Sequence, residues 1–206
     1  MITLLVGTQN RGKQREYQDL LADLPVKWVS PADVGLTGFD ADENGTSFEE
    51  NARRKALSYA QAAGMPTLAD DSGLVVDALN GAPGIYSARY AGPDATDADR
   101  YRKLLQELSG IPDAHRTARF VCVVALALPE GTVYTARGTV EGTIGHAPKG
   151  SQGFGYDPIF VLPDGRHLAE LPPHEKHRIS HRGRAIAAFK PKLLEILEAL
   201  NTPDDG

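Results

Sequence analysis

Cysteine is almost missing from this sequence, and long hydrophobic runs are missing altogether. The single cysteine, Cys122, lies inside the apolar run 120–128, where we expect a small buried side chain rather than a nucleophile or a disulfide partner. No apolar run approaches the roughly 20 residues that a transmembrane helix requires, and no signal-peptide pattern precedes the first predicted strand. These absences predict a protein of the reducing cytoplasm with no membrane partner.

Positive charge is also scarce. The 206 residues include 22 Lys and Arg against 27 Asp and Glu, which gives a formal net charge of −5. Proteins that bind nucleic acids or membrane surfaces need a dense positive field, so this balance argues against both kinds of partner. With 41% hydrophobic residues, the chain has the composition of a globular protein that buries a substantial core. We expect one domain over residues 1–200 and a disordered tail over 201–206.

Strand and helix patterns alternate along the chain. Apolar and β-branched runs predict strands at 2–6, 26–30, 67–69, 119–128, 132–139 and 158–162, and residues 74–76 are expected to be extended as well. Helical spacing predicts helices after residue 13, from Ser47 to about Ala63, from Asp97 to Leu108 with Thr96 as cap, and from about His181 onward. Because two of the strands form a hairpin across 129–131, the pattern favours an α/β fold, a three-layer domain with a mixed sheet flanked by helices.

The most informative stretch is residues 67–73, Thr-Leu-Ala-Asp-Asp-Ser-Gly. Its apolar start predicts the end of a buried strand, and Gly73 allows the backbone to turn. Neighbouring side chains of a strand point to opposite faces, so Asp70 and Asp71 enter one pocket only if the strand has ended, and one of them is expected to be structural. A carboxylate here suits Mg²⁺ or Mn²⁺ and a water placed for attack on phosphorus. The alternative is an Asp-Ser-Gly turn with local hydrogen bonds only.

Residues 7–14 nearly match the phosphate-binding P-loop. Both glycines and the lysine of that motif are present, but Gln14 stands where a P-loop has the Ser or Thr that binds Mg²⁺. A strand, a polar loop and a helix N-terminus still leave free N–H groups beside the charge of Lys13, which together attract phosphate. The side chains of Thr8 and Asn10 add further hydrogen-bonding groups.

Six motifs follow one another in a recognisable order: residues 8–13 (TQNRGK), 47–56 (SFEENA and then KA), 69–74 (ADDSGL), 81–89 (GAPGIYSAR), 153–158 (GFGYDP) and 180–183 (SHRG). Each motif alone is weakly specific, but the ordered set is highly specific. In this set the chain closely resembles the Ham1-type pyrophosphatases of inosine and xanthosine triphosphates. The resemblance runs from Leu4 to about Leu200.

The resemblance implies a fold, a reaction and an assembly. The fold is a single domain with an elongated mixed sheet, two lobes and a central cleft, and the assembly is a homodimer. The reaction is the hydrolysis of inosine, deoxyinosine and xanthosine triphosphates (ITP, dITP and XTP) between the α and β phosphorus atoms. It yields the monophosphate and pyrophosphate and cleanses the nucleotide pool. The implied cofactor is Mg²⁺, with Mn²⁺ as a substitute.

The resemblance also assigns roles by position. It makes Asp71 the metal ligand or general base and Glu43 the second metal ligand, and it gives triphosphate binding to Thr8, Asn10 and Lys13. Ser72 is expected to touch substrate, and the nucleoside-binding positions are Phe154, Gly155, Tyr156, Asp157, Lys176, His181 and Arg182. The residues themselves do not choose between Asp70 and Asp71, and Asp42 is open as a partner of Glu43. Gln9 departs from the pattern, because the family commonly has glycine there.

Base selection has a physical explanation in this set of residues. Hypoxanthine and xanthine present an oxygen acceptor at the purine 6-position, where adenine presents an amino donor. Donors from His181 or Arg182 would therefore favour the deaminated bases, and hydrogen-bonding sites discriminate by roughly 10⁴ in favourable cases. Phe154 is a candidate stacking surface for the base.

Two other classes of function fit part of the pattern. The first is a P-loop kinase or NTPase, which the glycines and lysine of residues 7–13 favour and Gln14 opposes. The second is a non-enzymatic nucleotide-binding module, in which the acidic pair only closes a turn. Product analysis separates the first from a pyrophosphatase, and nucleotide binding without metal-dependent turnover would indicate the second.

Overall fold

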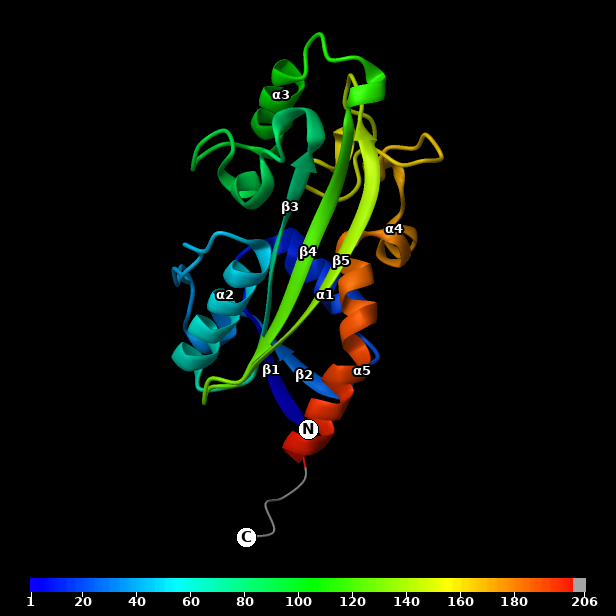
Figure 1. Cartoon of the computed structure of the whole chain (residues 1–206). Helices are drawn as coiled ribbons and strands as arrows, with labels where there is room; N and C mark the ends of the chain where they lie inside the picture. The colour runs from blue at the N-terminus through cyan, green and yellow to red at the C-terminus, as the bar shows by residue number, and fades with distance from the viewer. Residues whose placement is uncertain (202–206) are drawn as a thin grey trace. The chain divides into compact units, whose positions relative to one another are not determined.

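The fold of this computed structural model, which describes residues 1–201, is built on a six-stranded sheet flanked by helices (Figure 1). The strands are β1 (Ile2–Val6), β2 (Val26–Val29), β3 (Thr67–Val76), β4 (Thr117–Ala127), β5 (Val133–Ile144) and β6 (Phe160–Val161). The helices are α1 (Arg11–Leu20), α2 (Phe48–Ala63), α3 (Asp97–Glu107), α4 (Pro173–Ile179) and α5 (His181–Asn201). Across the sheet the strands follow the order β2-β1-β3-β4-β5-β6.

The sheet is mixed, as predicted. β1 pairs in parallel with β2, with Ile2 opposite Val26, and in parallel with β3, with Leu5 opposite Thr67. At the other end of the order, β5 and β6 pair in antiparallel fashion, with Thr143 opposite Val161. A parallel pair needs a crossover connection, and α1 and α2 supply the two crossovers around β1.

The helix starts follow the predicted caps. The Ser47 side chain accepts the N–H of Glu50 at the start of α2, and Thr96 forms a reciprocal capping box with Asp99 at the start of α3. α5 begins at His181, as expected, and continues through Pro191 to Asn201. The first residue of the predicted tail is therefore helical, and the rest of that tail lies outside the described residues. Within residues 1–201, none of the helices combines the length and the apolar character needed to cross a bilayer.

The prediction that a strand ends at the acidic pair is wrong, whereas the extended form predicted for residues 74–76 is confirmed. β3 runs without interruption through Asp70, Asp71 and Gly73 to Val76. Its second half stays extended because Leu74 and Val76 are fully buried, and burial of two such side chains outweighs the turn preference of Asp-Ser-Gly. β5 likewise continues to Ile144, beyond its predicted end at residue 139.

The chain divides into two compact units. Unit 1 contains residues 1–71, 123–138 and the chain from 184 onward, and unit 2 contains residues 72–122 and 139–183. The strands β3, β4 and β5 each contribute residues to both units.

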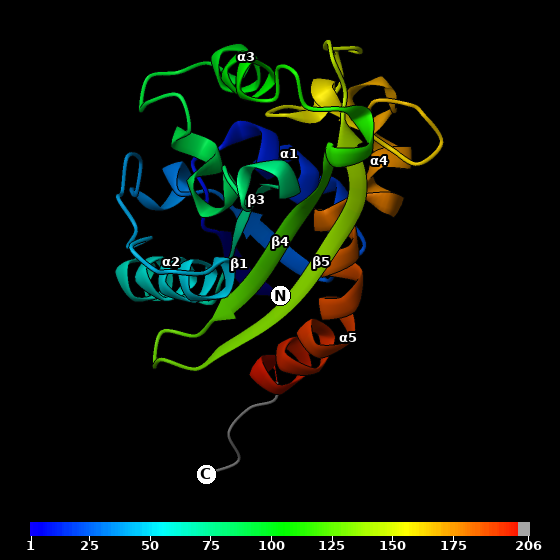
Figure 2. The same ribbon diagram turned by 45° about the horizontal axis from the view of Figure 1, so that its top comes forward.

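In unit 1, α2 packs against the sheet with small side chains. Ala52, Ala56 and Ala60, spaced four residues apart, share one buried cluster with Ala69 of β3 and Ala125 of β4. Figure 1 and Figure 2 both show α2 lying alongside β3. Because Ala69 faces α2, the alternation of β3 determines which acidic side chain faces the same way.

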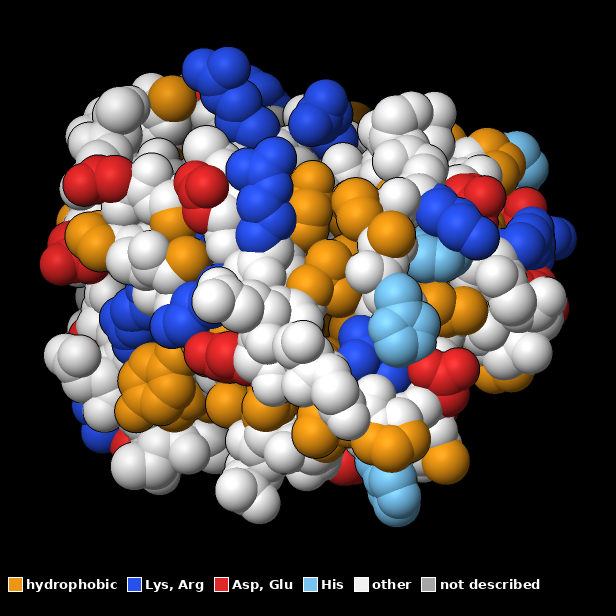
Figure 3. Space-filling model, turned by 90° about the horizontal axis from the view of Figure 1, so that it is seen from above, with side chains coloured by type: hydrophobic (Ala, Val, Ile, Leu, Met, Phe, Trp, Pro, Cys, Tyr) orange, Lys and Arg blue, Asp and Glu red, His pale blue; other side chains and the backbone are white. Residues whose placement is uncertain are grey.

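In unit 2, larger apolar side chains form the core. Leu74 of β3, Leu104 of α3 and Phe120 of β4 belong to one buried cluster, and the rings of Phe120 and Phe160 lie 4.7 Å apart between centroids. On the face that Figure 3 shows, acidic, basic and hydrophobic side chains are interspersed.

Candidate active site

The continuous strand β3 sends its two carboxylates to opposite faces of the sheet. Ala69 packs in the α2 cluster, and Asp71, two residues later, shares its face. Asp70 points to the other face, where its carboxylate is fully buried and pairs with Lys13 of α1 at 3.0 Å. A buried carboxylate held by a lysine is the structural member of the pair, so the geometry favours Asp71 for chemistry.

The phosphate-binding loop is held together by its own side chains. The Asn10 side-chain oxygen accepts the backbone N–H groups of Gly12 and Lys13, at 2.8 and 3.1 Å, and so caps α1. Two of the N–H groups at this helix start are therefore not free for phosphate, because Asn10 satisfies them locally. The amide nitrogen of Asn10 takes no part in the cap. Thr8 is buried, and its hydroxyl accepts the N–H of Asn10 at 3.2 Å.

Gln9 and Gln14 also stabilise this loop. Gln14 donates its side-chain amide to the carbonyl of Thr8 at 2.8 Å, so it serves the loop's own structure where a P-loop would have a metal ligand. Gln9, the departure from the family pattern, turns its amide toward the Leu36 carbonyl at 2.8 Å and the Tyr59 hydroxyl at 3.3 Å. Position 9 accommodates a side chain because the Gln9 amide forms hydrogen bonds with Leu36 and Tyr59.

Asp71 is a titratable group of unit 1 in an unusual setting. Burial raises its pKa from 3.8 to about 6, although the charge of Lys13 and a hydrogen bond with Asn51 oppose that shift. Its Oδ2 atom is buried and has no hydrogen-bond partner among the described residues. A raised pKa and an unsatisfied oxygen are typical of functional sites, since a purely structural carboxylate is normally satisfied.

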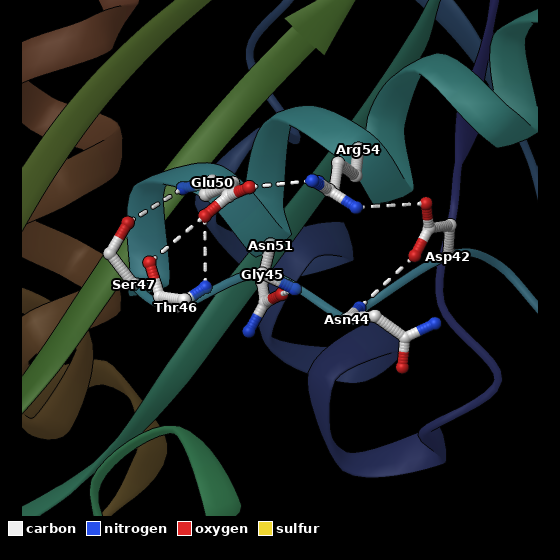
Figure 4. A network of polar contacts seen from close by, with 8 residues as sticks. All are labelled: Asp42, Asn44, Gly45, Thr46, Ser47, Glu50, Asn51 and Arg54. Carbon is white, nitrogen blue, oxygen red and sulfur yellow. Dashed lines mark hydrogen bonds and ion pairs between the residues drawn. The ribbon is translucent and has the colours of Figure 1, made fainter.

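In the acidic loop before α2, residues 40–45, Asp42 and Glu43 make different contacts. Asp42 pairs with Arg54 at 3.2 Å and accepts the N–H of Asn44 at 3.1 Å, as Figure 4 shows. The Asn44 N–H is the main reason that the pKa of Asp42 is lowered. Glu43 instead pairs with Lys55 at 2.6 Å, and its charge acts on Asp71. Both oxygens of Asp42 are thus engaged, one by Asn44 of the loop and one by Arg54 of α2, and Glu43 is the better candidate metal ligand.

The loop is joined to α2 by a wider network. Arg54 also bonds Glu50 at 2.6 Å, and Glu50 accepts the N–H of Thr46 at 2.9 Å (Figure 4). The Gly45 N–H donates to the Asn51 side chain at 2.7 Å, and Asn51 also hydrogen-bonds Asp71. Asn51 therefore connects the acidic loop to the candidate catalytic carboxylate.

The sequence does not identify Lys55 as a site residue, although Lys55 belongs to the motif at residues 47–56. Burial alone would lower its pKa, but the charges of Glu43, Asp70 and Asp71 outweigh burial and raise it. The available signal was its spacing, because Asn51 and Lys55 stand four residues apart and so share one face of a helix.

The residues present fit a hard divalent cation with few protein ligands. Among residues 1–201, no group of three or more His, Cys, Asp or Glu side chains is arranged to hold a metal ion. Mg²⁺, however, commonly uses one or two carboxylates and keeps waters or substrate phosphates as its other ligands. The unsatisfied Oδ2 of Asp71 and the nearby charge of Glu43 meet that requirement.

In unit 2, a buried ion pair organises the loop 153–157. Asp157 and Lys176 pair at 2.6 Å with almost no exposure, and Asp157 also accepts the N–H of Phe154 at 3.1 Å. The Lys176 ammonium lies 5.0 Å from the centroid of the Phe154 ring. Gly153 must be glycine, because its φ is +70° and a Cβ would lie 2.0 Å from an Asp157 oxygen.

The start of α5 adds further buried side chains to unit 2, one of them close to the Phe154 ring. Arg182 is buried, donates to the Ser72 hydroxyl at 2.9 Å, and holds its guanidinium carbon 5.8 Å from the Phe154 ring centroid. His181 is also buried and stacks on Phe120, with 4.7 Å between ring centroids. Tyr156 is buried as well and donates its hydroxyl to the Ser87 carbonyl at 2.7 Å.

The predicted site residues thus form two local groups. Unit 1 holds the predicted phosphate and metal residues Thr8, Asn10, Lys13, Glu43 and Asp71. Unit 2 holds Ser72 and the predicted nucleoside residues Phe154, Gly155, Tyr156, Asp157, Lys176, His181 and Arg182. Their binding roles stay predictions.

Comparison with known proteins covers nearly the whole chain. A model of the Ham1 family matches residues 4–192. A dITP/XTP pyrophosphatase of Syntrophobacter fumaroxidans is 49% identical over 199 residues, which cover 96% of this chain and 84% of that protein. A dITP/XTP pyrophosphatase of Geobacter sulfurreducens is 48% identical over 94% of this chain and 97% of its own length.

Solved structures agree with these matches. A HAM1 protein from Coxiella burnetii is 44% identical and superimposes with a TM-score of 0.85, covering 95% of this chain and 100% of that one. The Ham1 protein of Staphylococcus aureus is 38% identical, with a TM-score of 0.82 and coverage of 94% and 99%. The predicted α/β fold is confirmed.

Proposed function

Because this chain belongs to the Ham1 family, we propose that it hydrolyses ITP, dITP and XTP to the nucleoside monophosphate and pyrophosphate. The curated relatives that match almost end to end are named dITP/XTP pyrophosphatases. The observation that carries the proposal within the structure is Asp71, a buried carboxylate with a raised pKa and an unsatisfied oxygen within range of the Lys13 charge.

The chemistry demands charge neutralisation above all. A triphosphate brings several negative charges, and phosphoryl transfer depends on positioning and electrostatics more than on covalent catalysis. Lys13 and Lys55 supply two positive charges that act on Asp71 or its neighbour Asp70. Asp71, with a pKa of about 6, is mostly ionised at neutral pH and basic enough to take a proton from the attacking water.

Asp71 and Glu43 are the proposed ligands of Mg²⁺, with Mn²⁺ as a substitute and substrate phosphates as further ligands. Bound there, the ion would offset phosphate charge and lower the pKa of a coordinated water. The Lys55 ion pair holds Glu43 in place at 2.6 Å, and Asn51 orients Asp71. Thr8 and Asn10 are proposed to bind the triphosphate beside Lys13.

The nucleoside is assigned to the residues of unit 2. Phe154 offers a ring for stacking the base, and the buried donors of His181 and Arg182 favour an oxygen at the purine 6-position. Gly155, Tyr156, Asp157 and Lys176 shape this part of the site, and Ser72 touches substrate beside Asp71.

Substrate comparison tests this proposal. Initial rates with ITP, dITP, XTP, ATP and GTP in the presence of Mg²⁺ should give a kcat/KM at least ~100-fold higher for the deaminated purines than for ATP, since a buried donor is left unpaired by the adenine amino group. Equal kcat/KM values for ITP and ATP would remove the base-selection part of the proposal. No turnover of any of the five would indicate a binding module.

The family resemblance is also the support for two further proposals, a homodimer and a cytoplasmic location. Sedimentation velocity would show a species of twice the 22.1 kDa chain mass if the dimer forms. Nucleic acid is not proposed as a partner, since the net charge is −5 and the face in Figure 3 carries both signs of charge interspersed.

A further inference from the structure

We propose that Asp97, the first residue of α3, is a positioning residue for the loop 153–157, and this inference rests on the nucleoside-binding role proposed for that loop. The backbone N–H of Gly155 donates to Asp97 Oδ2 at 2.8 Å. The two residues stand 58 positions apart in the sequence, so this bond is a tertiary contact within unit 2. α3 and the loop lie at the same end of that unit (Figure 2).

Asp97 takes no part in the capping box of α3. The capping box of α3 is made by Thr96 and Asp99, whose side chains satisfy each other's backbone N–H groups at 3.1 and 2.9 Å. Asp97 instead pairs through Oδ1 with Arg100, one turn later, at 2.8 Å. The Arg100 side chain is 18% exposed and the Asp97 side chain 47% exposed. With Oδ1 held by Arg100, Oδ2 accepts the N–H of Gly155.

Two glycines make the backbone of this loop dependent on such bonds. Gly153 and Gly155 adopt φ values of +70° and +64°, where glycine supplies freedom rather than rigidity. From inside the loop, Asp157 holds the N–H of Phe154, and from outside it, Asp97 holds the next N–H along the chain. Together the two carboxylates fix consecutive peptides on either side of the Phe154 ring, and so they set where a base would stack.

Asp97→Ala tests the role, with Asp99→Ala as the matched control. Both changes remove one carboxylate from the first turn of α3, but only the first removes the bond to Gly155. Asp97→Ala should raise KM for ITP about tenfold with kcat within about twofold, the size expected for a hydrogen bond to a charged group. Asp99→Ala should lower the melting temperature through loss of the cap and leave KM within about twofold.

Hydrogen exchange of residues 153–157 in the ligand-free protein gives a readout that needs no turnover. Exchange there should be faster in Asp97→Ala and unchanged in Asp99→Ala. Asp97→Asn keeps an acceptor oxygen and should restore slow exchange and most of the KM, and it also serves if the alanine variant fails to fold.

Equal KM increases in the two alanine variants, or unchanged exchange at 153–157 in the Asp97 variants, would overturn the positioning role. Failure of the wild-type protein to hydrolyse ITP would instead overturn the proposed function, and the exchange result would still decide whether Asp97 holds the loop.

Discussion

At the scale of single residues, the setting of Asp71 links stability to activity. Its pKa is raised to about 6 chiefly by burial, so the folded protein retains a proton that the unfolded chain releases near its ordinary pKa of 3.8. Between these two values the contribution of Asp71 to stability falls as pH rises. Above pH 6 the protein carries a buried charge that costs stability, and that charge is the form proposed to act as base.

Asp71→Asn should therefore lose activity and gain stability. We expect kcat to fall by at least ~10³-fold, because a proton acceptor and a metal ligand are both removed. In metal-free buffer at pH 7.5 the variant should be more stable than wild type by at most about 3 kcal/mol, and the difference should shrink to under about 1 kcal/mol near pH 4, where Asp71 of the folded protein is neutral. Denaturant titrations at the two pH values provide the measurement. A variant less stable than wild type at pH 7.5 would show that the ionised Asp71 does not lower the stability of the folded protein.

The acidic loop offers a second residue-scale prediction, which separates Glu43 from Asp42. Millimolar Mg²⁺ should raise the melting temperature of the wild-type protein, because a ligand that binds only the folded state stabilises it, by about 1.4 kcal/mol at tenfold the Kd. Glu43→Gln should reduce this response. Asp42→Asn is the control, since Asp42 is engaged by Arg54 and Asn44 and should leave the response intact. The opposite pattern would transfer the metal role to Asp42.

At the scale of elements, close contact between helices positions the residues of unit 2. α4 ends at Ile179 and α5 begins at His181, and Gly183 in the first turn of α5 lies against the end of α4. A Cβ at Gly183 would lie 1.7 Å from the carbonyl oxygen of His177. The two helix ends approach this closely only because the residue at this position is glycine.

Gly183→Ala should force the two helix ends apart. We expect a loss of about 2 kcal/mol of stability, in the range of overpacking changes, and a higher KM for ITP because Lys176 and Arg182 move with their helices. Thermal unfolding and initial rates measure both effects. Arg178→Ala changes an exposed residue of α4 and should be close to neutral. Equal stability and equal KM in the two variants would show that the close approach of α4 and α5 affects neither stability nor substrate binding.

Elements defined by local signals were predictable from the sequence. The caps at Ser47 and Thr96 and the apolar faces of α2 and α3 are read from neighbouring residues, and these helices formed as expected. The extended form of residues 74–76 was predictable, but their union with residues 67–71 in one strand was not, because Leu74 and Val76 are buried against distant parts of unit 2.

The candidate site was likewise predictable where local signals define it and not where distant contacts do. That Asp70 and Asp71 face opposite sides followed from strand alternation. Only the fold places Lys13 against Asp70 and Lys55 against Glu43. The cap that Asn10 places on α1 was likewise invisible in the P-loop comparison, since that comparison concerns spacing and not the bonds a side chain makes.

At the scale of the whole molecule, each unit contains one part of the proposed reaction. Unit 1 holds the charged residues proposed for the phosphates and the metal, and unit 2 holds the aromatic and buried groups proposed for the nucleoside. Neither group alone specifies a pyrophosphatase of deaminated purines. Family membership joins the two groups in one activity.

The most direct test is the identity of the products. Purified protein incubated with ITP and Mg²⁺, followed by phosphorus NMR, should give inosine monophosphate and pyrophosphate in equal amounts, and chelation of the metal should stop the reaction. Release of inosine diphosphate and orthophosphate would place cleavage at the other phosphoanhydride bond and contradict the account.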